Sequence, residues 1–138
     1  FSESITGGLL SSCLTNIKDA SKVFEMGFIV YSNEAKIRLL NVNPEIIDRF
    51  GVYSKNTVEE MLNGNKAITN ADIIVAVSGI AGPDKIEGYE VGETYIGFMF
   101  KREKIIIKNI YIGNREEIRL KIVEFCFGEI LKKLKDMI

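Results

Sequence analysis

The feature that most constrains the fold is one apolar run, Ala71-Asp-Ile-Ile-Val-Ala-Val-Ser78. Strands that are covered on both faces read as nearly continuous apolar runs, whereas half-exposed strands alternate apolar and polar residues. The run has the length of a strand, and β-branched residues fill its centre. It therefore predicts a central strand with helices packed on both of its faces.

Helical and extended patterns alternate around this strand. Apolar spacings of three and four predict a helix that begins after the loop at residues 4–8 and a long helix at the end of the chain. The predicted helices are 34–40, 45–50, 55–68 and 115–137, and the predicted strands are 26–31, which we expect to be buried, and 92–100 and 104–112, which we expect to form an antiparallel hairpin. The 138 residues contain no repeat or linker and predict one domain over 1–138. Because the chain starts at Phe1 rather than Met, we expect a preceding helix or strand to be missing.

The chain contains no histidine, which is the composition fact that most constrains its chemistry. Ser-His-Asp and Cys-His catalysis and His-containing zinc sites are excluded within one chain. The net charge of −1 provides no bulk attraction to nucleic acid or to an anionic membrane, so neither is an expected partner. Cys13 and Cys126 lie in apolar surroundings, far apart in the sequence, and we expect both to be buried and reduced, as in a cytoplasmic protein.

Two glycine-containing loops are candidate ligand sites. The first, with Ser4, Thr6, Gly7 and Gly8, leads into a helix N-terminus, where backbone N–H groups could bind an anion such as phosphate. A plain capped helix would explain the same residues. The second, with Ser78, Gly79, Ala81 and Gly82, follows the predicted central strand, and ligands of α/β sheets bind beyond the carboxyl ends of strands. An ordinary turn would explain it equally.

Ser21, Tyr31 and Lys36 form the third constellation. Without histidine, a serine nucleophile needs another base, and a buried lysine of lowered pKa can accept the hydroxyl proton directly or through a tyrosine. Taken alone, the residues are more typical of a helix-capping serine, a tyrosine at the end of a strand and a solvated lysine. Composition does not separate these readings.

Several separate motifs of the chain resemble those of one family. The matching stretches are 3–10 (ESITGGLL), 24–36 (FEMGFIVYSNEAK), 78–83 (SGIAGP), 91–92 (VG) and 114–119 (NREEIR). In order and approximate spacing they are similar to the C-terminal domain of the competence/damage-inducible protein CinA, a family that includes the stand-alone nicotinamide-nucleotide amidohydrolase. The resemblance covers essentially the whole chain.

This resemblance implies a three-layer α/β/α sandwich with a mixed sheet. It also implies hydrolysis of the carboxamide of nicotinamide mononucleotide (NMN) to nicotinate mononucleotide and ammonia, for NAD salvage, with no metal or cofactor. The family's catalytic serine, tyrosine and lysine are carried over onto Ser21, Tyr31 and Lys36, and both loops would bind the nucleotide. We expect a cytoplasmic homo-oligomer, most simply a dimer.

The chain departs from the family pattern at several positions. Ile5 replaces Cys, Lys18-Asp19 replaces Pro-Gly, Ser78 replaces Thr, and the loop 84–90 lacks the glycine-rich start and the proline before Val-Gly. Two alternatives therefore stay open beside the amidohydrolase. One is a nucleotide-binding domain without turnover, and the other is a partner-binding domain in DNA uptake or repair. Release of ammonia from NMN separates the amidohydrolase from both of these alternatives.

Overall fold

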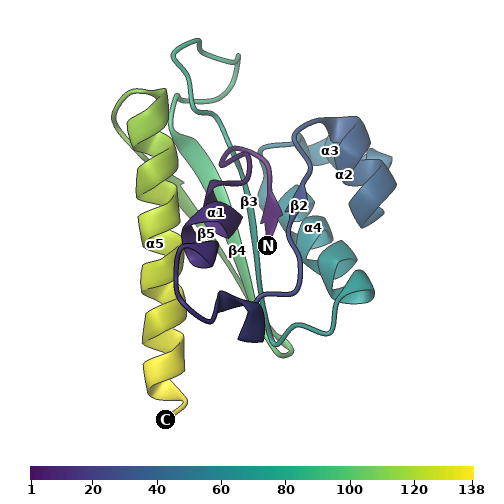
Figure 1. Cartoon of the computed structure of the whole chain (residues 1–138). Coiled ribbons are helices and arrows are strands. Elements are labelled where there is room, and N and C mark those ends of the chain that lie inside the picture. The colour runs from purple at the N-terminus through teal and green to yellow at the C-terminus, as the bar shows by residue number, and fades with distance from the viewer.

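Helices cover both faces of a five-stranded mixed sheet in the computed structural model, which describes residues 1–138 (Figure 1). The strands follow the order β2-β1-β3-β4-β5 across the sheet. Their bounds are β1 Ser2–Glu3, β2 Phe28–Ile29, β3 Ile73–Gly79, β4 Glu93–Phe100 and β5 Glu103–Ile110. The helices are α1 Leu9–Thr15, the 3-10 turn η1 Ala20–Lys22, α2 Asn33–Leu40, α3 Pro44–Phe50, α4 Lys55–Ile68 and α5 Arg115–Asp136. The expected single-domain α/β sandwich is confirmed.

The apolar run forms the central strand β3, as predicted. It pairs in parallel with β1 on one side and antiparallel with β4 on the other, with Ala76 opposite Ser2 and Gly97. Strands β4 and β5 form the expected hairpin, and β1 pairs in parallel with β2. The carboxyl ends of β1, β2 and β3 therefore lie at the same edge of the sheet.

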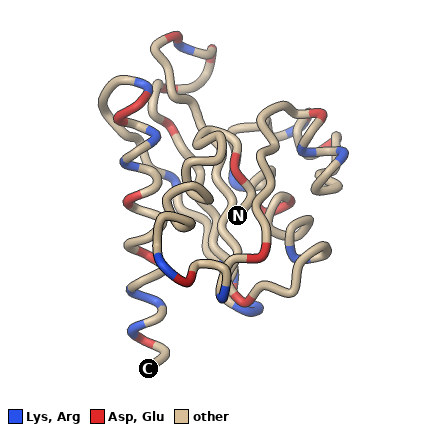
Figure 2. Tube along the Cα trace, in the orientation of Figure 1, with Lys and Arg blue, Asp and Glu red and all other residues tan.

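Two apolar cores lie on the two faces of the sheet. Alternate residues of β3 face opposite sides: Val75 and Val77 pack with α1 and α5, whereas Ile74 and Ala76 pack with α2 and α4. Helix α5 runs along one face of the sheet, while α2, α3 and α4 gather on the other (Figure 1). None of the helices is long and apolar enough to cross a membrane. Figure 2 shows basic and acidic residues interspersed along the chain.

Polar caps define where most of the helices begin. The side chains of Ser32, Asn43, Ser54 and Asn114 each accept a hydrogen bond from a backbone N–H in the first turn of the following helix. These bonds satisfy N–H groups that have no partner within the helix. The four helices begin within one residue of the starts predicted from the sequence.

The predicted buried strand over 26–31 is wrong in length and in burial. Only Phe28 and Ile29 form a strand, at the edge of the sheet, and 57% of Ile29 is exposed. Strand β2 is short because its partner β1 is itself only two residues long. Strand β1 was not predicted because Ser2 and Glu3 are polar, although both are fully buried.

The cysteines differ from one another in burial. Cys126 is fully buried in α5 as expected, and burial raises the pKa of its thiol. Cys13 is only half-buried, so the expectation was wrong for this residue. It lies on the short helix α1, whose only fully buried side chain is Leu10. Both cysteines are free thiols.

Candidate active site

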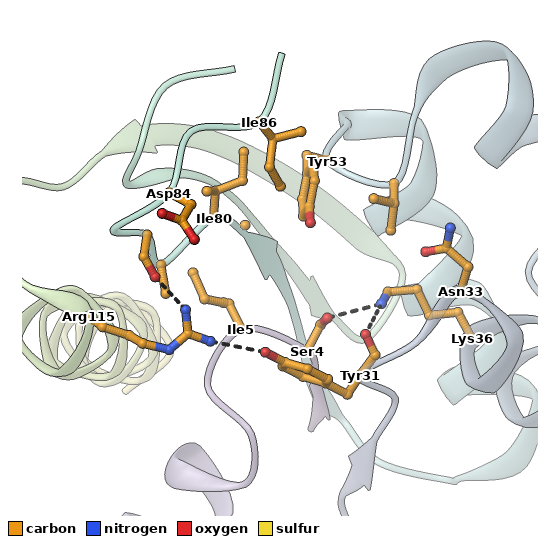
Figure 3. A pocket seen from close by; sticks show the side chains of 14 residues that line it. Ser4, Ile5, Tyr31, Asn33, Lys36, Tyr53, Ile80, Asp84, Ile86 and Arg115 are labelled. Carbon is orange, nitrogen blue, oxygen red and sulfur yellow. Dashed lines mark hydrogen bonds between the residues drawn. The ribbon is translucent and has the colours of Figure 1, made fainter. Parts of the chain in front are cut away.

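A cavity of about 300 Å³ lies at the carboxyl ends of the three parallel strands (Figure 3). Residues that follow β1, β2 and β3 line it, together with the loop before α4 and the first residue of α5. The lining comprises Ser4, Ile5, Tyr31, Asn33, Lys36, Val52, Tyr53, Gly79, Ile80, Ala81, Gly82, Asp84, Ile86 and Arg115. The position agrees with the general location of ligand sites in open α/β sheets.

Lys36 is among the largest fully buried side chains of the protein, with 1% of its surface exposed. It lies in the first turns of α2, which Ser32 caps, and it makes no ion pair. Desolvation lowers its pKa from 10.5 to about 8. A large fraction of an amine with such a pKa is neutral near pH 8, so it can act as a proton acceptor.

The partners of the Lys36 amine can satisfy either its charged or its neutral form. Nζ donates to the carbonyl oxygens of Val30 at 2.8 Å and Tyr31 at 3.4 Å, and it lies 2.9 Å from Ser4 Oγ. A neutral amine has two N–H donors and one lone pair. The two carbonyls can only accept, so in the neutral form the lone pair is left for the hydroxyl of Ser4. Ser4 and Lys36 thus form a hydrogen-bonded pair at the base of the cavity.

Tyr31 lies at the rim of the cavity, with 63% of its surface exposed. Its contact with Lys36 is through the main-chain carbonyl, whereas its hydroxyl accepts a hydrogen bond of 3.0 Å from Arg115. The guanidinium of Arg115 also donates to the carbonyl oxygen of Gly82 at 2.5 Å. Arg115 therefore links the tyrosine to the loop that follows β3 (Figure 3).

The structure does not bring Ser21 together with Tyr31 and Lys36. Ser21 is an exposed residue of η1, which packs against α1 and precedes the amino end of β2. Tyr31 and Lys36 instead follow the carboxyl end of that strand, and Ser21 does not line the cavity. Asp19, which replaces the family's glycine, adopts a left-handed backbone with φ of 68°. An aspartate tolerates that conformation better than most residues, and it lies outside the site.

The predicted anion site in the first loop is already filled by the protein's own carboxylate. Buried Glu3 accepts hydrogen bonds from the Thr6 hydroxyl at 2.7 Å, from the Leu10 N–H at 2.8 Å, and from the N–H and hydroxyl of Ser11. Thr6, Gly7 and Gly8 do not line the cavity. Their assignment as substrate-binding residues is therefore not supported by their positions, whereas Ser4 does lie in the cavity.

The second loop contributes most of its predicted residues to the cavity. Gly79, Ala81 and Gly82 line it, but Ser78 is buried and donates its hydroxyl proton to the carbonyl oxygen of Val52 at 3.1 Å. The backbone N–H groups of Ala81 and of Ile5, the residue after Ser4, make no hydrogen bond within the chain. Donors of this kind can stabilise a developing oxyanion.

Sequence reasoning missed Tyr53, Asp84, Ile86 and Arg115, which all line the cavity. A signal existed for Arg115. It occupies the first position of α5, where the helix dipole favours acidic residues such as Glu116 and disfavours a cation. Tyr53, Asp84 and Ile86 carry no such signal, because loops place side chains through tertiary packing. No three His, Cys, Asp or Glu side chains are grouped so that they could hold a metal ion.

Comparisons with known proteins agree with this architecture. The chain is 46% identical over 132 residues to a CinA-like protein of Petrotoga mobilis, covering 95% of this chain and 33% of that protein. It is 38% identical over 133 residues to the nicotinamide-nucleotide amidohydrolase PncC of Enterobacter agglomerans, covering 95% of this chain and 81% of that protein. The chain thus spans about a third of the CinA-like relative and most of the amidohydrolase.

Solved structures show the same fold. A competence damage-inducible protein A from Klebsiella pneumoniae superposes with a TM-score of 0.94 at 31% identity, covering 97% of this chain and 84% of that one. A competence or damage-inducible protein from Enterobacter asburiae gives 0.93 at 34% identity, covering 96% and 84%. The model of the CinA C-terminal domain matches residues 1–134. The chain therefore belongs to the CinA C-terminal domain family.

Proposed function

We propose that this domain hydrolyses the carboxamide of NMN to nicotinate mononucleotide and ammonia, with Ser4 as the nucleophile and Lys36 as the base. The observation that carries the proposal is the 2.9 Å contact between Ser4 Oγ and the buried, unpaired amine of Lys36. The similarity to a protein named nicotinamide-nucleotide amidohydrolase supports the choice of substrate. Ser4 replaces Ser21 in this role because Ser21 lies outside the cavity.

Acylation would proceed through the Ser4–Lys36 pair. Neutral Lys36 takes the hydroxyl proton as Ser4 Oγ forms a bond to the carboxamide carbon. The free N–H groups of Ile5 and Ala81 are the candidate donors for the oxyanion. The lysine then returns the proton to the leaving nitrogen, the C–N bond breaks, and ammonia departs from an ester of Ser4.

Hydrolysis of this ester completes the cycle. Lys36 takes a proton from water as the water oxygen attacks the ester carbon, and the protonated amine returns that proton to Ser4 Oγ when the C–O bond breaks. The balance is one amide and one water converted into one carboxylic acid and one ammonia. The hydroxyl of Tyr31 lies on Arg115 rather than on Lys36, so Tyr31 assists by holding the amine through its carbonyl.

The phosphate of NMN would lie at Arg115. The first loop has no room for a second anion beside Glu3, and Lys36 is engaged with Ser4 at the base of the cavity. Arg115 uses two of its five N–H donors on Tyr31 and Gly82, so donors remain for a phosphate oxygen. NMN should therefore bind more tightly than nicotinamide riboside.

Ammonia release from NMN tests the proposal. Wild type should release ammonia, Ser4→Ala should release none while it keeps its fold and its affinity for NMN, and Ser21→Ala should be as active as wild type. Ser21→Ala is the matched control because it removes the same hydroxyl from an exposed position. An active Ser4→Ala variant would refute the assignment. Tight binding of NMN by wild type without release would support a binding domain without turnover.

A further inference from the structure

One aromatic side chain of the cavity has no part in the proposed chemistry. Tyr53 lies in the loop between α3 and α4 and lines the cavity opposite the Ser4–Lys36 pair (Figure 3). Its hydroxyl makes no hydrogen bond to another side chain or to the backbone. Tyr31 is the only other aromatic residue of the lining. Tyr53 therefore presents to a ligand both its ring and a hydroxyl that is free to form a hydrogen bond.

The Tyr53 ring is held in place from behind. Tyr89 packs edge-on against it, with ring centroids 5.2 Å apart and an interplanar angle of 78°. The hydroxyl of Tyr89 in turn lies over Gly51, where a Cβ atom would approach it to 2.4 Å. Burial, with Tyr31 and Tyr89 adding to it, raises the pKa of Tyr53, so the phenol is neutral and its ring keeps its electron-rich face.

The cavity has few groups that could stabilise a positively charged ligand, and an aromatic face is one of them. The substrate's base is a pyridinium ring with a positive charge, and it would lie next to Lys36 when its carboxamide reaches Ser4. Asp84 is the only acidic side chain of the lining and makes no ion pair, and the other charged groups are the cations Lys36 and Arg115. An aromatic face attracts a cation but carries no net charge, so it does not raise the pKa of Lys36. A nearby carboxylate would also attract the cation, but it would raise that pKa.

We propose that Tyr53 determines specificity by stacking on the charged pyridinium ring, so that the site prefers N-glycosylated pyridinium carboxamides to analogues with a neutral ring. This inference rests on the proposed function, since it assumes that the carboxamide is directed at Ser4. In this proposal Tyr89 is a positioning residue, which fixes the orientation of the Tyr53 ring through the edge-on contact.

Binding to a Ser4→Ala protein tests the inference without turnover. NMN and reduced NMN carry the same phosphate, ribose and carboxamide, but the dihydropyridine ring of reduced NMN is neutral. Calorimetry should show that NMN binds 5- to 30-fold more tightly than reduced NMN, the range expected for a cation over a partly desolvated aromatic ring. Adding Tyr53→Leu should reduce this ratio to below 2, whereas adding Tyr53→Phe should preserve it.

Tyr95→Leu is the matched control, because Tyr95 is a half-buried tyrosine of β4 that does not line the cavity. It should leave the ratio unchanged. Equal affinity of the Ser4→Ala protein for the two nucleotides would overturn the inference even if Tyr53→Leu failed to fold. A ratio that persists in Tyr53→Leu would overturn it as well. If either of these results is found and wild type still releases ammonia from NMN, only the role of Tyr53 is refuted. If the protein does not bind NMN at all, both proposals are refuted.

Discussion

Lys36 should make the protein more stable as the pH rises, and substituting Lys36 should remove this effect. Burial lowers the pKa of this amine from 10.5 to about 8. Below pH 8 the lysine is protonated in both the folded and the unfolded chain, so folding carries the full cost of burying a charge. Between pH 8 and 10.5 only the unfolded chain binds the proton, so stability rises with pH in this range.

The magnitude follows from the two pKa values. Their difference of about 2.5 corresponds to about 3.4 kcal/mol of unfolding free energy between low and high pH. About 2 kcal/mol of this should be regained between pH 7 and pH 9.5, where most proteins lose stability or change little. Lys36→Met cannot titrate, so the difference between wild type and this variant isolates the contribution of the lysine.

Urea unfolding of both proteins at the two pH values measures this difference. The free energy of unfolding of wild type relative to Lys36→Met should rise by about 2 kcal/mol. Lys55→Met, at an exposed lysine of α4, controls for the exchange of lysine for methionine. In parallel, ammonia release by wild type should increase with pH through an apparent pKa near 8, and Lys36→Arg should be inactive. A flat stability difference, or an active arginine variant, would refute a neutral lysine base.

Three further predictions concern other parts of the molecule. Arg115→Gln should raise the KM for NMN at least tenfold but leave that for nicotinamide riboside within a factor of 2 in ammonia-release assays, and equal effects would exclude a phosphate contact. Glu3→Gln should cost about 1–3 kcal/mol in urea unfolding, because an amide NH₂ would face N–H and hydroxyl donors. Gly64→Ala should cost about 1–3 kcal/mol of stability, because its Cβ would lie 1.9 Å from the Leu40 carbonyl oxygen. Gly128→Ala is the control and should be neutral or stabilising, because the space around Gly128 is open. Equal thermal stabilities of the two variants would contradict the close α2–α4 packing.

Much of the fold followed from local patterns because each pattern had a local physical cause. The run 71–78 predicted a strand covered on both faces because apolar residues occupy both of its faces, and apolar spacings of three and four predicted the longer helices. The exceptions were β1 and β2, which are two residues long. Their pairing depends on tertiary contacts, because no periodicity is visible over two residues and Glu3 is buried through hydrogen bonds rather than apolarity.

The site was only partly accessible from the sequence. The residues alone were compatible with a solvated lysine at position 36, and only the family resemblance singled it out as a base; the structure places it buried, in the cavity. The serine was harder to choose. Ser4 and Ser21 are both hydroxyls near turns, and only the parallel pairing of β1 with β2 places Ser4 beside the residues that follow Val30. A serine nucleophile must lie within hydrogen-bond distance of its base, so the pairing of β1 with β2 decides between Ser4 and Ser21.

A lysine base has to be protected from carboxylates, and this requirement explains the arrangement of charges. A carboxylate within about 4–6 Å would raise the pKa of Lys36 and leave it protonated. Glu3 is adjacent to Ser4 in sequence, but its side chain is directed to α1 and the loop before it, where four donors engage it. A bound pyridinium would act in the opposite sense, since its positive charge favours the neutral amine. The pH profile of kcat for NMN should therefore lie at lower pH than that of kcat/KM, because the first reports the complex and the second the free enzyme. Coincident profiles would show that the substrate's charge is not felt at Lys36.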